Sequence, residues 1–391
     1  MKRIKVLHII TRLDKGGSSE NTLLTVKNLD NERYESSILY GMTKNPDEKY
    51  LPSVKKNIEV FFNIEDLVRE INPLKDVKAF FKIYSFISKN NYHIVHTHSS
   101  KAGILGRWAA KFTGVPVIVH TPHGHIFYGY YGKIISWIFI FIERITASIT
   151  DNLICLTERG KKEHISFKVG DEKKISVIHS GVDVDSIKNY AQKNERPFVK
   201  KNRIPPNSFV VGSMGRFVKV KGFEYFIKAA KIVSSKIDNA YFMLAGEGEL
   251  EKSLKKLVLE YGLEKKFFFI PWQSDCRAFL YSLDLYVLSS VNEGMGKVIV
   301  EAMAAGLPVI GTDVGGVREI IEDGLTGFVI PPEDERSIAE KIEQLFFNKE
   351  LRNRMGLMGQ KRADSFSVKR MVEKIENLYR KLLKEKGLVN E

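Results

Sequence analysis

Short runs of valine, isoleucine and leucine alternate with helix-length amphipathic segments along nearly the whole chain, and this alternation constrains the fold most strongly. Strands of a parallel sheet are buried on both faces and therefore consist of such apolar runs, joined by helical crossovers. The expected strands are 4–10, 36–40, 93–97, 117–121 and 152–157 in the first half, and 209–214, 241–246, 267–270, 284–289, 308–312 and 328–330 in the second. The pattern predicts an α/β protein made of repeated βα units.

The chain of 391 residues is too long for one ordinary core and suits two domains. Each half opens with an apolar strand and a glycine-bearing turn, "HIITRLDKGGSSE" in the first and "VVGSMGRFVKVKG" in the second. The polar stretch 192–208 contains three prolines and is expected to hold the domain boundary. We therefore predict two facing Rossmann-like domains, 1–190 and 207–366, and a charged C-terminal helix in 367–391 that crosses back to the first domain.

The net charge of +14 raises the question of a nucleic-acid partner. Residues 1–185 contain 27 basic and 20 acidic side chains, and residues 186–370 contain 29 and 23, so the excess is +7 and +6. This even spread argues against a nucleic-acid groove and suits anionic ligands and an anionic membrane surface. Cys155 and Cys276 lie far apart with no metal-ligand spacing, which favours a reducing cytosol.

Two segments bear on membrane association. The start, "MKRIKVLHIITRLD", has too short an apolar run for a signal peptide and is interpreted as the first strand. The window 134–142, "IISWIFIFI", is about half the length that crosses a bilayer. It predicts a core helix that continues to about residue 150; the alternative is a helix edge that touches lipid. The expected location is cytoplasmic, with peripheral association at the inner face of the membrane.

Residues with unusual chemistry follow the expected strands at their carboxyl ends, where open parallel sheets bind ligands. They are Gly16 and Gly17, His123 and Gly124, Arg216, Gly246 and Gly248, Glu293, and Gly315 and Gly316. The coincidence of six such loops at one end of their strands indicates a binding site more strongly than any one glycine pair does.

The segment "GRFVKVKG" contains the best candidates for an anion site. Arg216 and Lys221 precede a helix expected to begin near Gly222, and they could neutralise a diphosphate without a metal. The alternative is a solvated cluster of charges. The "DVD" string at 183–185 matches an Asp-x-Asp metal motif, but it is short enough to arise by chance, and no metal is expected.

The segment "NEGMGKVIVEAMAAG", residues 292–306, places one glutamate before a helix and one inside it. If the helix starts near Gly296, Glu301 lies about five residues in, a rise of about 7.5 Å. That spacing suits a sugar at Glu293, a ribose at Glu301 and phosphates at the helix start. The alternative is a charge on the helix dipole and an exposed glutamate, although Val300 and Ala302 flank Glu301.

Together these motifs resemble those of a known family. "GRFVKVKG", "AGEGEL", "NEGMGKVIVEAMAAGLPVIGTDVGGVREII" and "GLTGFVIPPED" are similar to the second domain of GT-B glycosyltransferases of family 4, the group 1 type. "KGGSSE", "HTHSSKAG", "HTPHGH" and "HSGVDVD" resemble its first domain and linker. The resemblance implies retaining, metal-independent transfer of a hexose from a nucleotide-sugar, most often a UDP-sugar, to an acceptor hydroxyl in the cleft between the two domains, with no cofactor.

The resemblance also implies roles for single residues. It assigns the donor diphosphate to Arg216 and Lys221, the donor sugar to Glu293 and the ribose to Glu301. Amides of Met295, Gly296 and Lys297 would lie near sugar and phosphate, Gly17 would touch the phosphates, and Gly246 and Gly248 complete the expected donor contacts. His123 resembles the histidine near the reacting carbon, whereas His120 and His125 could equally be packed polar residues or part of a metal site.

Two departures and several rival functions stay open. Pro271 and Trp272 stand near the expected nucleobase site in place of a glycine, and Met295 replaces the usual aromatic of the EGFG pattern. The rivals are a nucleotide-sugar epimerase, a phosphorylase and a catalytically silent sugar-binding subunit. A dehydrogenase is disfavoured because no GxGxxG turn follows either opening strand. The expected acceptor is a lipid-linked glycan or a saccharide for surface polysaccharide.

Overall fold

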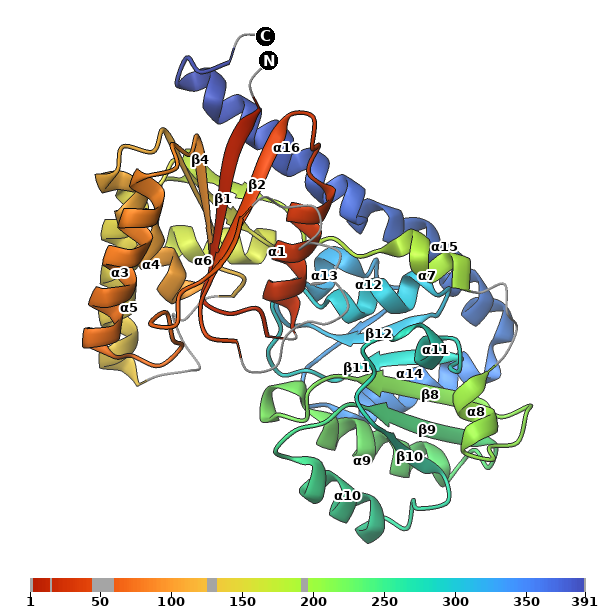
Figure 1. The fold of residues 1–391 in the computed structure, drawn as a ribbon. Helices are drawn as coiled ribbons and strands as arrows, with labels where there is room; N and C mark the ends of the chain where they lie inside the picture. Colours follow the sequence, from red (N-terminus) through yellow and green to blue (C-terminus); the bar gives the residue numbers. More distant parts are fainter. Residues whose placement is uncertain (1–2, 15, 44–59, 125–131, 191–195, 390–391) are drawn as a thin grey trace. The chain divides into compact units, whose positions relative to one another are not determined.

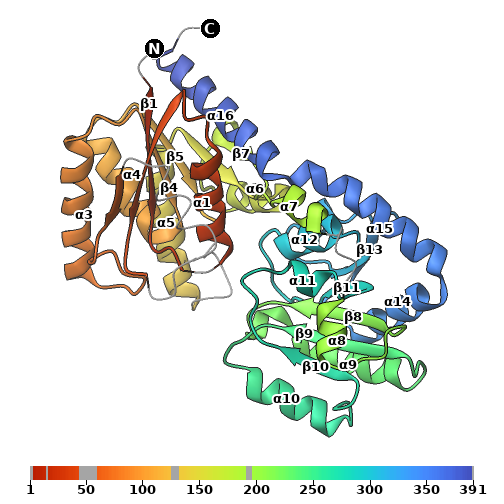
Figure 2. The ribbon, with the colours of Figure 1, turned by 45° about the vertical axis from the view of Figure 1, so that its right-hand side comes forward.

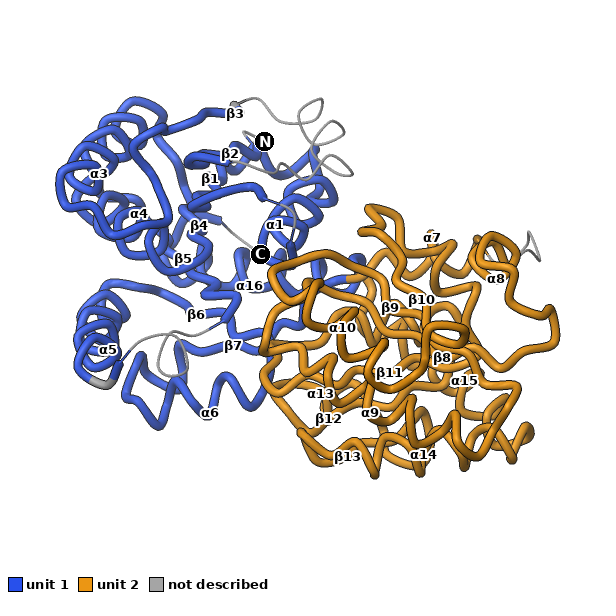
Figure 3. Tube along the Cα trace, turned by 90° about the horizontal axis from the view of Figure 1, so that it is seen from below, with its two compact units in different colours: residues 1–181, 368–391 blue, residues 182–367 orange. Residues whose placement is uncertain are grey.

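The computed structural model describes residues 3–14, 16–43, 60–124, 132–190 and 196–389. The chain forms two compact units, shown in separate colours in Figure 3. Unit 1 comprises residues 1–181 and 368–391, and unit 2 comprises residues 182–367. Each unit contains one parallel sheet with helices on both faces, so the predicted α/β fold with two Rossmann-like domains is confirmed.

Unit 1 is built on a seven-stranded parallel sheet of order β3-β2-β1-β4-β5-β6-β7, as far as the described residues show. Its strands are β1 Ile4–Ile10, β2 Tyr34–Tyr40, β3 Val60–Asn63, β4 Ile94–His98, β5 Val117–Thr121, β6 Asn152–Cys155 and β7 Ile175–Val177. Its helices are α1 Gly17–Asn28, α3 Pro73–Ser88, α4 Ser100–Phe112, α5 Lys133–Ser148, α6 Glu158–Ser166, the 3-10 turn η1 Glu172–Lys174, and α16 Val368–Glu385. The order of its first six strands is that of a dinucleotide-binding fold.

The two faces of the first sheet carry separate cores. Val6 and Ile10 of β1 pack with α1 and α16, whereas Leu7 and Ile9 pack with α3 and α4. This alternation follows from the two-residue period of a strand. Figures 1 and 2 show α16 beside α1, so the C-terminal helix returns to the first sheet as predicted.

Unit 2 contains a six-stranded parallel sheet of order β10-β9-β8-β11-β12-β13, again for the described residues. Its strands are β8 Phe209–Met214, β9 Ala240–Ala245, β10 Phe267–Ile270, β11 Leu285–Leu288, β12 Val309–Thr312 and β13 Gly327–Ile330. Its helices are α7 Val184–Lys188, α8 Pro197–Lys201, η3 Lys219–Lys221, α9 Phe223–Ser234, α10 Glu251–Glu260, α11 Arg277–Leu280, α12 Lys297–Ala304, α13 Val317–Ile320, α14 Glu335–Phe347, α15 Lys349–Ala363 and η4 Asp364–Phe366.

One core of unit 2 lies under α9, α10 and α14, where Phe226, Leu254 and Ile338 pack against the strands. Figure 1 shows α12 and α13 on the opposite face of this sheet. Ile299 and Met303 of α12 are fully buried there. The apolar helix that follows β11 is thereby held rigidly, and its first turn has a defined place at the end of the sheet.

The structure differs from the sequence prediction in three places. Strands β3 and β7 were not predicted, because runs of three or four residues carry too little periodicity. The units divide at 181/182 and 367/368 rather than within 192–208. The stretch 192–208 contains α8, whose Pro197 occupies the first turn and whose Phe198 is buried against Phe279.

Candidate active site

Three loops of unit 2 contact one another through hydrogen bonds and close backbone packing at the carboxyl ends of β8, β11 and β12. Ser289 Oγ donates to the carbonyl of Lys221 at 3.1 Å, and Thr312 Oγ1 donates to the carbonyl of Ser290 at 2.5 Å. Gly222 has φ +58°, and a Cβ there would stand 2.2 Å from the Ser289 oxygen. Gly315 has φ +54°, and a Cβ there would stand 1.9 Å from the Glu293 oxygen. These glycines therefore serve the close approach of one loop to the next.

Lys221 and Glu293 form an ion pair across these loops. Lys221 Nζ donates to Glu293 Oε2 at 2.6 Å, and their side chains are 21% and 16% exposed. Ser290 Oγ donates to the same oxygen at 3.1 Å. Because both bonds converge on Oε2, the carboxylate is oriented with Oε1 available to a ligand hydroxyl. The structure thus joins the residue predicted for the diphosphate to the residue predicted for the sugar.

Arg216 lies two residues beyond β8 and is exposed. Among the described residues its guanidinium forms no ion pair that would hold it elsewhere. The Lys221 side chain passes beside the preceding residue, since its Cε lies 3.6 Å from where a Cβ on Gly215 would stand. One cation is therefore held by a carboxylate and the neighbouring one is open to solvent.

Helix α12 begins at Lys297, next to its N-terminal cap Gly296, which has φ +81°. Met295 before it is buried, and Glu301 is the fifth residue of the helix and half-buried. The placement of the two glutamates before and inside the helix thus follows the sequence prediction. The amides of the first turn point out of the helix start, and the anion binding predicted for them stays a prediction.

Tyr286 of β11 was missed by sequence reasoning. Its hydroxyl lies 3.3 Å from both the amide nitrogen and the carbonyl oxygen of Met214, at the end of β8. Burial, with the carboxylates of Glu301 and Glu293 nearby, raises the pKa of Tyr286. The only signal was a tyrosine within an otherwise aliphatic strand, which does not by itself indicate a site.

Gly246 and Gly248 hold the loop after β9 against the loop that contains Arg216. A Cβ at Gly246 would stand 1.9 Å from the Gly215 oxygen, and one at Gly248 would stand 2.6 Å from the Phe217 oxygen. Phe217 donates its amide to the carbonyl of Glu247 at 2.8 Å. Close packing of two backbones accounts for these glycines, so their predicted donor contact stays a prediction.

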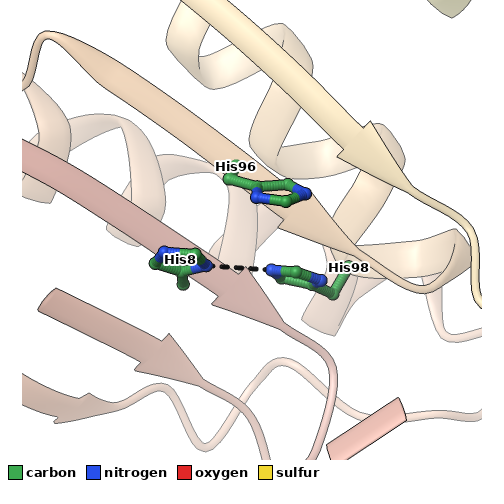
Figure 4. Close-up of side chains that lie close together, drawn as sticks. All are labelled: His8, His96 and His98. Carbon is green, nitrogen blue, oxygen red and sulfur yellow. Dashed lines mark hydrogen bonds between the residues drawn. The ribbon is translucent and has the colours of Figure 1, made fainter. Parts of the chain in front are cut away.

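Four histidines of unit 1 form a stack near the carboxyl ends of β1, β4 and β5, namely the buried His8, His96 and His98 and the half-buried His123. His8 Nδ1 lies 3.0 Å from His98 Nε2, and His98 Nδ1 lies 2.9 Å from His123 Nε2. His96 bonds to the hydroxyls of Tyr379 and Thr121 at 2.6 and 2.8 Å. Figure 4 shows the rings of His8, His96 and His98 and the bond between the first and the last. The stack lies on the sheet face covered by α16, which contributes Tyr379.

The stack also bears on metal binding. Within the described part of the chain, a set of histidines or acids close enough to hold an ion is formed by His8, His96 and His98, with ligand atoms within 4.8 Å of one another. This set contains neither a carboxylate nor a thiolate, and both ring nitrogens of His96 and of His98 are already hydrogen-bonded. A metal ion there would have to displace these hydrogen bonds at His96 and His98.

Other predicted residues have simple structural surroundings. Gly17 is the first residue of α1, and no atom of the described residues lies within 4 Å of a Cβ built on it. His120 is buried and bonds to Thr97 Oγ1 at 2.9 Å. Asp183 caps α7 by accepting the amide of Ser186 at 3.2 Å. His125 lies outside the described residues.

Comparison with known proteins places the chain in a family. Residues 194–362 match the family described as "Glycosyl transferases group 1", and residues 15–186 match "Glycosyltransferase Family 4". A curated relative in Escherichia coli, a UDP-Gal:alpha-D-GlcNAc-diphosphoundecaprenol alpha-1,3-galactosyltransferase, is 32% identical over 96% of this chain and 97% of its own length. The chain belongs to glycosyltransferase family 4, group 1 type. It is a hexosyltransferase-type enzyme, as the sequence predicts.

Further relatives of this glycosyltransferase agree with the assignment. The capsular polysaccharide biosynthesis glycosyltransferase CapM of Staphylococcus aureus is 29% identical over 88% of this chain and 92% of its own length. Among solved structures, HepE of Anabaena in complex with UDP has a TM-score of 0.80 at 20% identity, covering 97% of this chain and 100% of that one. This likeness confirms the GT-B fold.

The described part of the glycosyltransferase contains no helix that is both long and apolar enough to span a membrane. Helix α5, which contains the most apolar window of the sequence, has 16 residues. Several of its large apolar side chains are nevertheless exposed to solvent. The sequence alternative of a helix edge in contact with lipid is taken up below.

Proposed function

We propose that this glycosyltransferase moves a hexose from a UDP-sugar to a hydroxyl of a lipid-linked glycan, with retention of the anomeric configuration and without a metal. The observation that carries the proposal is the Lys221–Glu293 pair beside the open cation Arg216. A diphosphate is bound by cations, and sugar hydroxyls donate hydrogen bonds to a carboxylate. The cations and the carboxylate lie together here, at the ends of the adjacent strands β8 and β11. The Escherichia coli relative, named for a UDP-sugar and a diphosphoundecaprenol acceptor, supports the substrate classes.

The proposed mechanism is driven by the leaving group. The bond between the anomeric carbon and the nucleotide diphosphate breaks, the acceptor oxygen forms a new bond to that carbon from the same face, and the acceptor hydroxyl proton passes to the departing diphosphate. Arg216 and Lys221 stabilise the negative charge that develops on the departing diphosphate, where preorganised cations have their largest effect. Glu293 holds sugar hydroxyls through Oε1, Glu301 holds the ribose, and amides around Gly296 bind phosphate; neither carboxylate transfers a proton.

Residues of unit 1 complete the proposal. Packing within the described part of the chain does not explain the glycine at position 17, since a Cβ there would meet none of its atoms within 4 Å. A glycine with open space at a helix start suits an amide that phosphates approach closely. His123, whose ring is hydrogen-bonded to His98, is assigned to the reacting end of the donor sugar.

A thermal-shift series tests the base of the donor. UDP at about 100 times its Kd is expected to stabilise the native state by about 2.7 kcal/mol and to raise Tm by about 5–10 °C. Trp272 is exposed just beyond β10, in the region expected to border the base. GDP, ADP and CDP serve as matched controls and are expected to give smaller shifts at equal concentration. A larger shift with one of them would replace UDP in the proposal.

We further propose that helices α3 and α5 bind an anionic membrane surface. Leu74, Val77 and Phe81 form an exposed stripe on α3, and Ile134, Trp137, Phe141 and Ile145 form one on α5. Both helices flank α4 on the same face of the sheet in unit 1. The lysines at 75, 78 and 82 lie on α3 beside its stripe, an arrangement that suits acidic headgroups around an apolar contact.

Liposome co-sedimentation at low salt tests this surface. The wild-type protein is expected to sediment with vesicles that contain phosphatidylglycerol and less with pure phosphatidylcholine. The double variant Ile134→Gln/Trp137→Gln, which alters side chains 78% and 63% exposed, should reduce the bound fraction at least about threefold. Phe347→Gln/Leu357→Gln, with 74% and 63% exposure in unit 2, is the control and should bind like wild type. An equal loss of vesicle binding in both variants would contradict the proposal. So would a protein that dimerises through α5 and does not sediment with vesicles.

A further inference from the structure

The ion pair between Lys221 and Glu293 places a negative charge inside the proposed diphosphate site. Lys221 Nζ lies 2.6 Å from Glu293 Oε2, and both side chains are partly exposed to solvent. Glu293 Cγ lies 3.6 Å from where a Cβ on Gly296 would stand, so the glutamate side chain lies at the start of α12. The carboxylate therefore stands beside the two groups, the lysine and the helix start, to which the proposed function assigns phosphate.

The ion pair is not needed to join its two loops. Val291 donates its amide to the carbonyl of Val220 at 2.9 Å. Ser289 Oγ donates to the carbonyl of Lys221 at 3.1 Å. Because these bonds hold the loops together without the charged groups of Lys221 and Glu293, the side chains of the pair can respond to a ligand while the backbone stays in place.

The charges of three side chains decide how strongly a diphosphate is attracted to this place. Arg216 and Lys221 contribute +2 and Glu293 contributes −1, which leaves +1 for the three together. Two opposite charges 2.6 Å apart act on a third charge as a dipole, whose attraction is weaker than that of a lone cation. Lys221 therefore attracts a phosphate less strongly than it would without Glu293.

The donor and the product carry different charges. In a nucleotide-sugar each phosphate has one negative charge, because both ends of the diphosphate are substituted. After transfer the terminal phosphate has a second pKa of about 6, so at pH 7.5 the proton taken from the acceptor hydroxyl is lost to water and nearly one further negative charge remains. The sugar hydroxyls, which donate to a carboxylate, leave with the transferred hexose. A carboxylate at this position is therefore less compatible with the product than with the donor.

We propose that Glu293 is a specificity-determining residue whose carboxylate favours the sugar-bearing donor and weakens binding of the free nucleoside diphosphate, so that the product is released. The inference rests on the function proposed above and deepens it. While the donor is bound, its sugar hydroxyls donate to Oε1, the oxygen that Lys221 and Ser290 leave open. Once the hexose is transferred, these hydroxyls are gone and the carboxylate faces the additional charge of the terminal phosphate.

Isothermal titration calorimetry with UDP at pH 7.5 tests the direction of this effect. Glu293→Gln removes the charge and keeps the shape of the side chain. The variant should bind UDP about 3- to 10-fold more tightly than wild type, although it alters a residue of the binding site. Replacing a residue that only held its loops would weaken UDP binding or leave it unchanged. A Kd for UDP that is unchanged or larger in Glu293→Gln overturns the proposal.

The sugar-bearing donor should respond differently. UDP-galactose and UDP-glucose are titrated in parallel, and the one that wild type binds more tightly is compared with UDP. Its Kd should not decrease in Glu293→Gln, because the lost charge-assisted hydrogen bonds to sugar hydroxyls offset the reduced repulsion. The ratio of the Kd for UDP to the Kd for the UDP-hexose should therefore fall at least about threefold. An unchanged ratio would mean that the carboxylate does not discriminate donor from product.

Two control variants separate the charge of Glu293 from other causes. Glu293→Asp keeps the charge, and its Kd for UDP should stay within about twofold of wild type. Glu247→Gln removes an exposed carboxylate from the loop after β9, where the carbonyl of Glu247 accepts the amide of Phe217 next to Arg216. It should also change the Kd for UDP by less than about twofold. A gain in either control equal to that in Glu293→Gln would contradict the proposal.

The identity of the base is separable from the role of Glu293. If GDP gives the larger thermal shift in the series above, the same titrations are made with GDP. Tighter GDP binding by Glu293→Gln would then support the role of Glu293 and exclude UDP from the proposed function. Tight UDP binding by wild type that weakens in Glu293→Gln would retain UDP and overturn the role of Glu293.

Discussion

Replacing both proposed diphosphate ligands in the variant Arg216→Ala/Lys221→Ala is expected to reduce kcat at least about 10³-fold. Removal of one preorganised group that stabilises developing charge reduces kcat by about 10²–10³. The two side chains lie at the same loop, with Lys221 held by Glu293 at 2.6 Å. Transfer of radiolabelled sugar from UDP-sugar to a lipid-linked acceptor measures the loss.

The fold should survive this double substitution. Arg216 is exposed, and the pair that Lys221 forms with Glu293 is partly solvated, so its loss costs about 1 kcal/mol of unfolding free energy. The control is Lys252→Ala/Lys265→Ala, which removes two exposed cations of unit 2 outside these loops. Near-normal turnover in the first variant, or an equal loss in the control, would exclude the assignment of leaving-group stabilisation to Arg216 and Lys221.

A second large effect is expected on acidification. Between pH 7 and pH 5, unit 1 should lose stability while unit 2 changes little. Burial lowers the pKa of His8 to about 3, and it holds the pKa of His96, His98 and His120 well below the usual 6.5. These rings stay neutral in the folded state at pH 5, whereas they bind protons once unfolded.

The direction and size of this loss of stability follow from the protons that the histidines bind on unfolding. Since the unfolded chain binds more protons between the folded and unfolded pKa values, stability is fully present above pH 6.5 and is lost as pH falls toward 3. His8 alone should contribute a loss of about 2 kcal/mol between pH 7 and pH 5. The other three buried histidines act in the same direction, so the sum is large beside the stability of one domain.

Unit 2 supplies an internal control for this prediction. All nine histidines of the chain lie within residues 1–181, so unit 2 has none. Hydrogen–deuterium exchange, corrected for the intrinsic effect of pH, should show protection lost first in peptides from β1, β4 and β5. Equal or earlier loss in peptides from β8 to β13 would contradict it, and His8→Gln should shift the loss in unit 1 to lower pH.

Much of the fold could be predicted from the sequence because its signals are local. The run at 209–214 and the glycine-led helix after Gly296 coincide with β8 and α12 within one residue. The short strands β3 and β7 carry no such signal. The boundary at 181/182 could not be predicted either, because the polar stretch 192–208 suggested a linker. In the structure this stretch contains α8, whose Phe198 is buried in unit 2.

By itself, the sequence determined the parallel α/β architecture, the family, and which residue types stand at the carboxyl ends of the strands. Periodicity and spacing along one segment carry that information. Only the tertiary structure decided which side chains meet. Lys221 bonds to Glu293, 72 positions away, and His96 bonds to Tyr379, 283 positions away.

Such partners depend on strand order, on the register of adjacent strands and on the direction of each side chain, and no local pattern records them. The same holds for the buried histidines of unit 1. His98 bonds to His8, 90 positions away on another strand, and to His123, 25 positions away in the loop after β5. The residue types of the site could therefore be predicted from the sequence, whereas the partner of each side chain was set by packing.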